Sequence, residues 1–303
     1  MNADAPGPAD LDTTTGLRKR IDTTKAHPAR VYDVFLGGKD NYPADREAAA
    51  LAAKANPRGH LDVRHNRDFI RRAVTALTAE TGIRQFLDIG TGLPTQQNVH
   101  QIAQAIAPES RIVYVDNDPI VLVHAQALLT SSPEGRTDYI EADLRDPAKI
   151  LEAARRILDF DRPVALVLAA VLHFIEDDEA HPVVAQLLDA LPSGSHLVLS
   201  HLSADMNPAP INKVAETFRK RGFSFVLRRR EEIERFVTDN GLELLSPGIV
   251  ASRHWRPDHA ADATEVRGPA PEQLDHLDEG RYVSISEATD EDVNIYVLVA
   301  RKP

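Results

Sequence analysis

The sequence predicts an α/β fold in which helices cover both faces of a doubly wound, mainly parallel sheet. Between residues 85 and 200, short apolar runs alternate with segments of helical length. Several of these runs are continuously apolar, which is typical of strands buried on both faces of a parallel sheet. Strand–helix repetition of this kind implies right-handed βαβ crossovers and therefore a doubly wound sheet.

The predicted elements follow one another in a regular order. We expect strands at Gln85–Ile89, Ile112–Asp116, Asp138–Glu141, Val164–Leu168 and His196–Ser200. The periodicity predicts helices at about 94–107, 119–130, 147–158 and 178–190. After residue 200 the regular alternation of strands and helices ends. Helices at about 208–221 and 229–239 precede a short strand near 242–245, and a strand at 293–300 closes the chain.

The chain divides into three predicted parts. Residues 1–25 have a biased composition without periodicity, which is typical of a disordered tail. Residues 26–82 are expected to form a helical cap or lid, made of a loop at 28–45, an Ala-rich helix and a helix at 61–81. Residues 83–303 form the predicted ligand-binding domain, with a surface insertion at about 257–280.

Composition and charge exclude several classes of protein. The 303 residues, 43% of them hydrophobic, suffice for one large domain with a substantial core. The formal net charge of −11 disfavours binding to nucleic acid, and the absence of cysteine excludes disulfides and thiolate chemistry. No secretory signal or membrane-length apolar run is present. We expect a cytoplasmic protein without membrane contact, and the oligomeric state is not predicted.

The strongest local motif is a strand that ends in an acid and two glycines, FLDIGTGLP at residues 86–94. Gly90 and Gly92 lack Cβ where the backbone must turn sharply and approach a ligand. A helix predicted to begin at Pro94 would present free N–H groups there. Asp88 would repel a pyrophosphate but can pair with the α-amino group of methionine. Thr95 replaces the third glycine of the dinucleotide-binding pattern, and an ordinary strand–helix turn is the alternative.

Two further strands also end near acids. Asp116 can accept both hydroxyls of a ribose, and the neighbouring Asn117 is assigned to the same site. Asp143 can accept from the exocyclic amine of adenine while Leu144 packs on the ring; a role as a turn or cap residue is the alternative for Asp143. Because the carboxyl ends of parallel strands meet at one edge of a sheet, we expect these residues to share one site with Asp88.

These motifs resemble those of a known family. Residues 88–92, 115–116 and 142–143 resemble motifs one to three of class I S-adenosylmethionine (SAM)-dependent methyltransferases. More narrowly, the chain is similar to the actinomycete S-adenosyl methyltransferase family formerly catalogued as a domain of unknown function. The segments that carry this similarity are 29–42 (ARVYDVFLGGKDNY), 64–67 (RHNR), 88–95 (DIGTGLPT), 115–119 (VDNDP) and 246–248 (SPG). The resemblance implies SAM as cofactor and a Rossmann-like, seven-stranded sheet whose last strand is antiparallel, but it implies no acceptor.

Two histidines are candidates for proton transfer. His173 follows the fourth predicted strand and His201 ends the fifth, where an imidazole could accept a proton from the methyl acceptor. The alternative is that each ring only caps a turn or bonds backbone. The acidic run at 176–179 is explained by a helix N-terminus, so no metal site is predicted.

The segment from Gly37 to Tyr42 predicts a tight loop. We expect Gly38, Asp40 and Asn41 to contact the cofactor as part of a lid. A turn that merely joins two helices is the alternative.

The sequence therefore predicts a SAM-dependent methyltransferase that acts on an unidentified small-molecule acceptor. Two alternatives remain at this stage: a non-catalytic regulatory module that binds SAM or a nucleotide, and an NAD-linked oxidoreductase.

Overall fold

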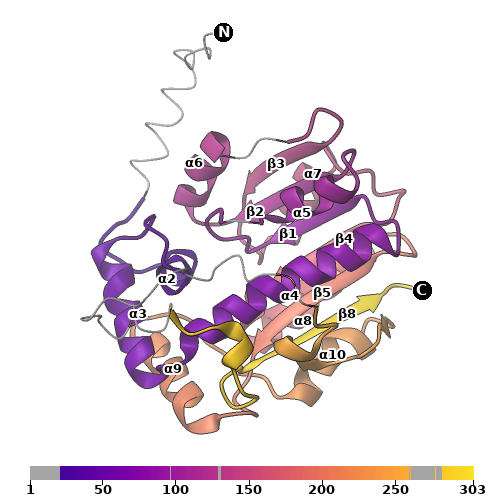
Figure 1. Cartoon of the computed structure of the whole chain (residues 1–303). Coiled ribbons are helices and arrows are strands. Elements are labelled where there is room, and N and C mark those ends of the chain that lie inside the picture. Colours follow the sequence, from indigo (N-terminus) through magenta and orange to yellow (C-terminus); the bar gives the residue numbers. More distant parts are fainter. Residues whose placement is uncertain (1–20, 96, 129–130, 259, 261–276, 278–281) are drawn as a thin grey trace, which may run out of the picture.

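A central sheet organises the chain (Figure 1). The structure, a computed structural model, describes residues 21–95, 97–128, 131–258, 260, 277 and 282–303. Most of the predicted tail at 1–25 and most of the predicted insertion at 257–280 lie outside the described residues.

The sheet order is β3-β2-β1-β4-β5-β8-β6, with β7 also paired to β8. The strands are β1 (Gln85–Ile89), β2 (Arg111–Asp116), β3 (Arg136–Glu141), β4 (Ala165–Ala169), β5 (His196–Leu202), β6 (Glu243–Leu244), β7 (Val250–Ala251) and β8 (Ile295–Arg301). Strands β1 to β5 pair in parallel, and β8 runs antiparallel to β5. The short β6 and β7 pair with successive parts of β8, so together they make one interrupted edge strand. The predicted, mainly parallel sheet with an antiparallel last strand is confirmed. Seven strands were expected, whereas the described residues form eight, because the edge is divided into β6 and β7.

The helices lie between and around these strands. They are α2 (Pro28–Phe35), α3 (Pro43–Ala55), α4 (Gly59–Ala79), α5 (Val99–Ile106), α6 (Pro119–Leu128), α7 (Pro147–Ala154), α8 (Asp177–Asp189), α9 (Pro208–Lys220) and α10 (Arg230–Thr238). Short 3₁₀ turns lie at Leu172–Phe174, Ser252–His254 and Ile285–Glu287. Strand order reverses at β1 and β4, and in open α/β sheets a ligand crevice lies at such a switch point.

The structure corrects two predicted helix boundaries. The helix expected at Pro94 begins only at Val99, because Asn98 caps it: the Thr95 N–H donates to Asn98 Oδ1 at 3.1 Å, and the Asn98 N–H donates to Gln101 Oε1 at 2.8 Å. Residues 28–35, expected within a loop, form α2. Pro28 starts that helix, where its missing N–H costs nothing, and His27 caps it.

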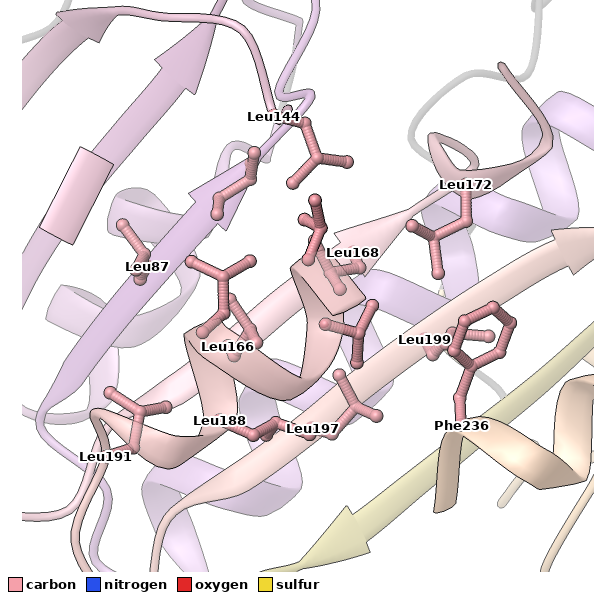
Figure 2. Packing of buried hydrophobic residues seen from close by; sticks show 14 of the residues in the cluster. Leu87, Leu144, Leu166, Leu168, Leu172, Leu188, Leu191, Leu197, Leu199 and Phe236 are labelled. Atoms are coloured by element: carbon pink, nitrogen blue, oxygen red, sulfur yellow. The ribbon is translucent and has the colours of Figure 1, made fainter. Parts of the chain in front are cut away.

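Each face of the sheet is buried under its own helices. Leucines of β1, β4 and β5 pack with residues of α8 and α10, as Figure 2 shows. The alternate residues of the same strands, including Phe86 and Val167, pack against α4 and α5 on the other face. Trp255 joins that second core, where its ring meets Phe69 edge-on at 5.4 Å. Because side chains alternate between faces along a strand, the same apolar runs build both cores.

The N-terminal helices have two different partners. Helix α4 packs on the sheet, whereas α2 and α3 gather with α9 at one end of the molecule (Figure 1). Of the predicted cap at 26–82, α2 and α3 therefore stand apart from the sheet while α4 covers it. Within the described part of the chain, no helix is long and apolar enough to cross a membrane.

Candidate functional site

A cavity of about 450 Å³ opens at the carboxyl ends of the parallel strands. Its walls come from the turns after β1, β2, β3 and β4, and from α2, α3, α4 and α9. The cavity therefore lies where the sheet meets the N-terminal helices, at the switch point between β1 and β4.

The structure brings eight of the predicted site residues to this one cavity. They are Asp88, Gly90, Gly92, Asp116, Asn117, Asp143, Leu144 and His173. The three strand-end carboxylates thus share a single crevice, which is the arrangement that one extended ligand requires.

Asp116 fixes the glycine turn from the end of β2. Its carboxylate accepts from the Gly92 N–H at 2.8 Å and from the Asp118 N–H at 2.9 Å. The residue is 8% exposed, and burial raises the pKa of its carboxyl group above the ordinary value. The turn and the carboxylate are therefore held in place before any ligand arrives, and lone pairs of both oxygens remain for further donors.

Asp88 lies on the neighbouring strand, near the end of β1. It is 9% exposed, and burial raises its pKa to about 6, although Thr91 and the charge of Arg67 act to lower it. An ionised carboxylate in so dry a place favours a cation as its partner.

Asp143 occupies a more open part of the cavity wall. Its carboxylate accepts from the backbone N–H of Arg145 at 2.9 Å and from Asn117 Nδ2 at 3.3 Å. The Arg145 guanidinium lies 3.2 Å from the same carboxylate. These bonds orient Asp143 and join it to Asn117 on the neighbouring loop.

The glycine turn is shaped by a close neighbour. Gly90 has φ +75°, and a Cβ there would lie 2.5 Å from Val171 Cγ2. Gly92 has φ +69°, but a Cβ there would meet nothing within 4 Å. Gly90 therefore permits close packing of the turn after β4, whereas Gly92 leaves its side of the cavity open.

His173 reaches the cavity but is a weak proton acceptor. Its ring contacts Phe174 and Phe225, with centroid distances of 4.3 and 5.0 Å. Among the described residues, Nδ1 of His173 has no hydrogen-bond partner. Burial, helped by the charge of Arg228, lowers the pKa of this imidazole to about 3. The ring is therefore neutral near pH 7 and suited to packing or hydrogen bonding.

The geometry does not support the predicted catalytic role of His201. Its side chain is fully buried and does not line the cavity. Nδ1 lies 2.8 Å from the carbonyl oxygen of Leu202, and Nε2 lies 2.8 Å from Nη1 of Arg228. Because a guanidinium can only donate, Nε2 must accept and Nδ1 must carry the hydrogen. Both nitrogens are occupied, so neither can take a proton from a ligand.

Gly38, Asp40 and Asn41 do not belong to the cavity lining, so their contacts with the cofactor stay a prediction. They surround Asp33 instead. The Asp40 N–H and Asn41 Nδ2 donate to Asp33 Oδ2 at 3.1 and 2.9 Å. A Cβ on Gly38 would overlap the same carboxylate. These residues therefore shape the turn that joins α2 and α3, which was the alternative to a lid.

Helix α4 supplies cavity residues that sequence reasoning did not select: Asp62, Asn66 and Arg67. Asn66 Oδ1 accepts from Ser200 Oγ at 2.6 Å, and Asn66 Nδ2 donates to Tyr32 Oη at 3.0 Å. Two of the three lie in the RHNR segment at 64–67, which carried the family resemblance. The sequence did contain a signal for them: these polar residues recur at helical spacing on one helix, α4, which packs on the sheet.

A buried ion-pair network ties α2 to the end of β2. Arg30 Nε lies 2.8 Å from Asp118 Oδ2, and His27 Nδ1 lies 3.1 Å from the same atom. Arg30 Nη1 also lies 3.6 Å from Asp45 Oδ2 at the start of α3. Since the N–H of Asp118 bonds Asp116, the network links both N-terminal helices to the carboxylate in the cavity.

The far end of the cavity is apolar and aromatic. Phe174, Phe218 and Phe225 line it, with the rings of Phe218 and Phe225 stacked at 4.9 Å. In the part of the chain that the structure describes, no group of three or more His, Asp or Glu side chains is placed to hold a metal ion.

Comparison with known proteins gives one consistent result. Residues 14–303 match the protein family described as S-adenosyl methyltransferase. The fold is similar to a DUF574 family protein from Streptomyces avermitilis, with 48% identity, a TM-score of 0.83 and coverage of 94% of this chain and 100% of that one. It is also similar to a putative methyltransferase from Thermobifida fusca, with 38% identity, a TM-score of 0.78 and coverage of 95% and 97%. No curated protein matches the chain.

Proposed function

This chain belongs to the S-adenosyl methyltransferase family, and from that premise we propose that its cavity holds SAM beside a small-molecule acceptor. The protein is a SAM-dependent methyltransferase, and SAM is its cofactor. When bound, SAM supplies an electrophilic methyl group on a sulfonium. The identity of the acceptor and the roles of the cavity residues are the subject of the proposal.

One observation carries it: Asp88, Asp116 and Asp143 open into a single cavity that continues into an apolar end. The three carboxylates suit the cationic and hydrogen-bond-donating parts of SAM, and the turn at Gly92 leaves room beside them. The apolar end remains for an acceptor. A substrate of small-molecule size is favoured because the space is enclosed by helices on the side opposite the sheet.

We assign the polar residues by their chemistry. Asp88, a buried carboxylate whose ionised form favours a cationic partner, is assigned to the α-amino group. Asp116, held by two backbone N–H groups, is assigned to the ribose hydroxyls. Asn117, Asp143 and Leu144 are assigned to the adenine, with the Leu144 side chain against the ring. The enzyme's own contribution to the reaction is then largely orientation and exclusion of water.

Calorimetric titration with S-adenosylhomocysteine tests these assignments. We expect the wild-type protein to bind it and Asp116→Ala to weaken binding by about 1–3 kcal/mol, because hydrogen-bond partners are left unpaired. Asp239→Ala, at an exposed carboxylate after α10, is the matched control and should bind as wild type. Unchanged affinity in Asp116→Ala would remove Asp116 from the site.

The same titration addresses the alternatives. Tight NAD binding would favour an oxidoreductase. Binding of S-adenosylhomocysteine without any methylated product, when labelled SAM is incubated with cell extract, would favour the regulatory module. Neither alternative gains support from the family match. The cytoplasmic location expected from the sequence stays a prediction.

A further inference from the structure

Aromatic rings form part of the wall at the apolar end of the cavity, beside aliphatic side chains such as Ile211 and Val214. Phe174 meets Phe225 edge-on at 5.4 Å, and Phe218 stacks on Phe225 at 4.9 Å. The ring of His173 lies 5.0 Å from Phe225 and is held neutral by burial, which lowers its pKa. Aromatic rings pack face-to-edge or offset on one another, so walls of this kind favour a flat aromatic guest.

The positive charges that line the cavity already act on carboxylates of the protein. Among the described lining residues, the only Lys or Arg side chains are Arg67 and Arg145. Arg67 acts on Asp88, and Arg145 pairs with Asp143 and Glu179. An anionic acceptor would therefore lose its hydration at the aromatic end without gaining a cationic partner, which is strongly unfavourable.

One buried carboxylate of the cavity lining lies near Phe35, which packs against the cluster that contains Phe218 and Phe225. Asp62 of α4 lines the cavity and is buried. Its Oδ2 is 3.4 Å from Asn56 Nδ2. The side chains of Asn56 and Phe35, which both line the cavity, lie next to each other at Gly59, since a Cβ on that glycine would be within 4 Å of both. The second oxygen, Oδ1, accepts from the Asn294 N–H at 2.6 Å. No ion pair with a Lys or Arg is found for Asp62 in the described ranges.

The contacts of Asp62 leave it able to exchange a proton near neutral pH. Burial raises its pKa to about 7, and the nearby Asp292 acts in the same direction, while bonds from Asn294 lower it. Tyr32 of α2 also interacts electrostatically with Asp62, and Asp292 itself pairs with Arg58 at 3.6 Å. His173 offers no comparable basicity, since its pKa is lowered to about 3.

The presence of a carboxylate distinguishes between acceptor atoms. Beside an amine, it would stabilise the ammonium form, whose nitrogen has no free electron pair to attack a methyl group. Beside a hydroxyl, it would accept the hydrogen that the oxygen must lose during methylation. The geometry is therefore productive for an oxygen acceptor.

We propose that the acceptor is a neutral aromatic molecule with a phenolic hydroxyl, and that Asp62 receives its proton. The inference rests on the proposed function, since it concerns the acceptor end of the same cavity. The phenolic O–H bond breaks and its proton passes to the Asp62 carboxylate. The oxygen uses an electron pair to form the O–CH₃ bond, and the S–CH₃ bond breaks with its pair remaining on sulfur.

Binding of simple probes tests the substrate class without requiring turnover. The protein is saturated with S-adenosylhomocysteine and titrated by calorimetry with 2-naphthol, 2-methoxynaphthalene, 2-naphthylamine and 2-naphthoate. We expect 2-naphthol to bind roughly fivefold tighter than the methoxy compound, which cannot donate a hydrogen bond. We expect 2-naphthoate to bind at least about tenfold weaker than 2-naphthol. Equal or tighter binding of 2-naphthoate or 2-naphthylamine would overturn the substrate class.

The role of Asp62 is tested by the pH dependence of 2-naphthol binding. We expect the affinity to be about fivefold higher near pH 8 than near pH 6, because a hydrogen bond to an ionised carboxylate is stronger than one to a neutral carboxyl. Asp62→Asn retains an oxygen for the Asn294 N–H and should flatten this dependence. Asp68→Asn, on the same helix but outside the cavity lining, should retain it.

Persistence of the pH dependence in Asp62→Asn, with an unchanged melting temperature, would overturn the role of Asp62. The two proposals fail separately. A wild-type protein that does not bind S-adenosylhomocysteine contradicts the cofactor site, whereas one that binds it but prefers 2-naphthoate contradicts only the acceptor.

Discussion

At the scale of single residues, two glycines in one turn have different reasons to be glycine. Both have positive φ, which costs a non-glycine residue about 1–2 kcal/mol. Only Gly90 is also pressed against a neighbour, since its missing Cβ would lie 2.5 Å from Val171 Cγ2. Val171 in turn follows Ala170, whose own φ is +54°. The turns after β1 and β4 are therefore fitted to each other.

This contrast predicts unequal effects of two matched substitutions. We expect Gly92→Ala to lower the free energy of unfolding by about 1–2 kcal/mol, from backbone strain alone. Gly90→Ala should cost about 1–3 kcal/mol more, because overpacking forces Val171 to move. Urea denaturation of both variants measures the difference. Equal losses would show that the contact with Val171 is not limiting.

A second residue-scale prediction concerns the pH dependence of cofactor binding. The pKa of Asp88 is raised to about 6, so the folded chain binds a proton more tightly than the unfolded chain does. Its contribution to stability therefore falls as pH rises from about 4 to about 6 and is constant above that. Ligand binding has the opposite sign, because only the ionised carboxylate pairs with an α-amino cation.

We expect the affinity for S-adenosylhomocysteine to fall by about tenfold between pH 7 and pH 5, as Asp88 becomes protonated. Calorimetry at several pH values measures the fall, and Asp88→Asn should reduce it. Burial also raises the pKa of Asp116, so part of the dependence should survive in that variant. An affinity that is independent of pH in the wild-type protein would argue against both carboxylates as ligands.

At the scale of elements, the position of α2 depends on one buried arginine. The Arg30 and Asp118 side chains are only 5% and 1% exposed, and their pair joins α2 to the loop after β2. Asp45 at the start of α3 also lies beside Arg30 and accepts from the His27 N–H at 2.9 Å. The two N-terminal helices are therefore attached to the cavity edge by charge as well as by apolar packing.

Removing that arginine should destabilise the chain strongly. We expect Arg30→Ala to lower the free energy of unfolding by about 3–5 kcal/mol, because it strands a buried carboxylate. Arg46→Ala, at an exposed position on α3, should change it by no more than about 0.5 kcal/mol. Denaturant unfolding compares the two. A small loss in Arg30→Ala would mean that His27 alone neutralises Asp118.

At the scale of the whole molecule, the cavity connects segments that are far apart in the chain. Its walls include α2 from the N-terminal part, the strand ends of the sheet and α9 from the second half. A ligand there contacts both the sheet and the N-terminal helices. Ligand binding to the folded chain alone adds about 2.7 kcal/mol of stability at a concentration one hundred times Kd.

Amide hydrogen exchange should reveal this connection. We expect S-adenosylhomocysteine to slow exchange in the turn at 88–92 and also in α2, because α2 residues line the same cavity. Helix α7 packs on the face of the sheet opposite to α4. It serves as the internal control, and its exchange should change little. Protection of the turn without protection of α2 would indicate that the N-terminal helices do not respond to the cofactor.

Much of the site was readable from short segments of sequence. Short apolar runs placed β1 to β5, and the acids at or near the ends of three of them identified Asp88, Asp116 and Asp143, which the structure brings to one cavity. This succeeded because strand direction and the common edge of a parallel sheet follow from local pattern alone.

Tertiary structure alone decided which other side chains reach the cavity. Asp62 and Asn66 enter it because α4 lies across the sheet, and His201 is withdrawn because Arg228, distant in sequence, occupies its Nε2. The chain's own pattern set the elements and the cofactor edge, since backbone geometry and periodicity are properties of adjacent residues. Access to a cavity depends instead on packing between segments brought together only by folding, which no local pattern encodes.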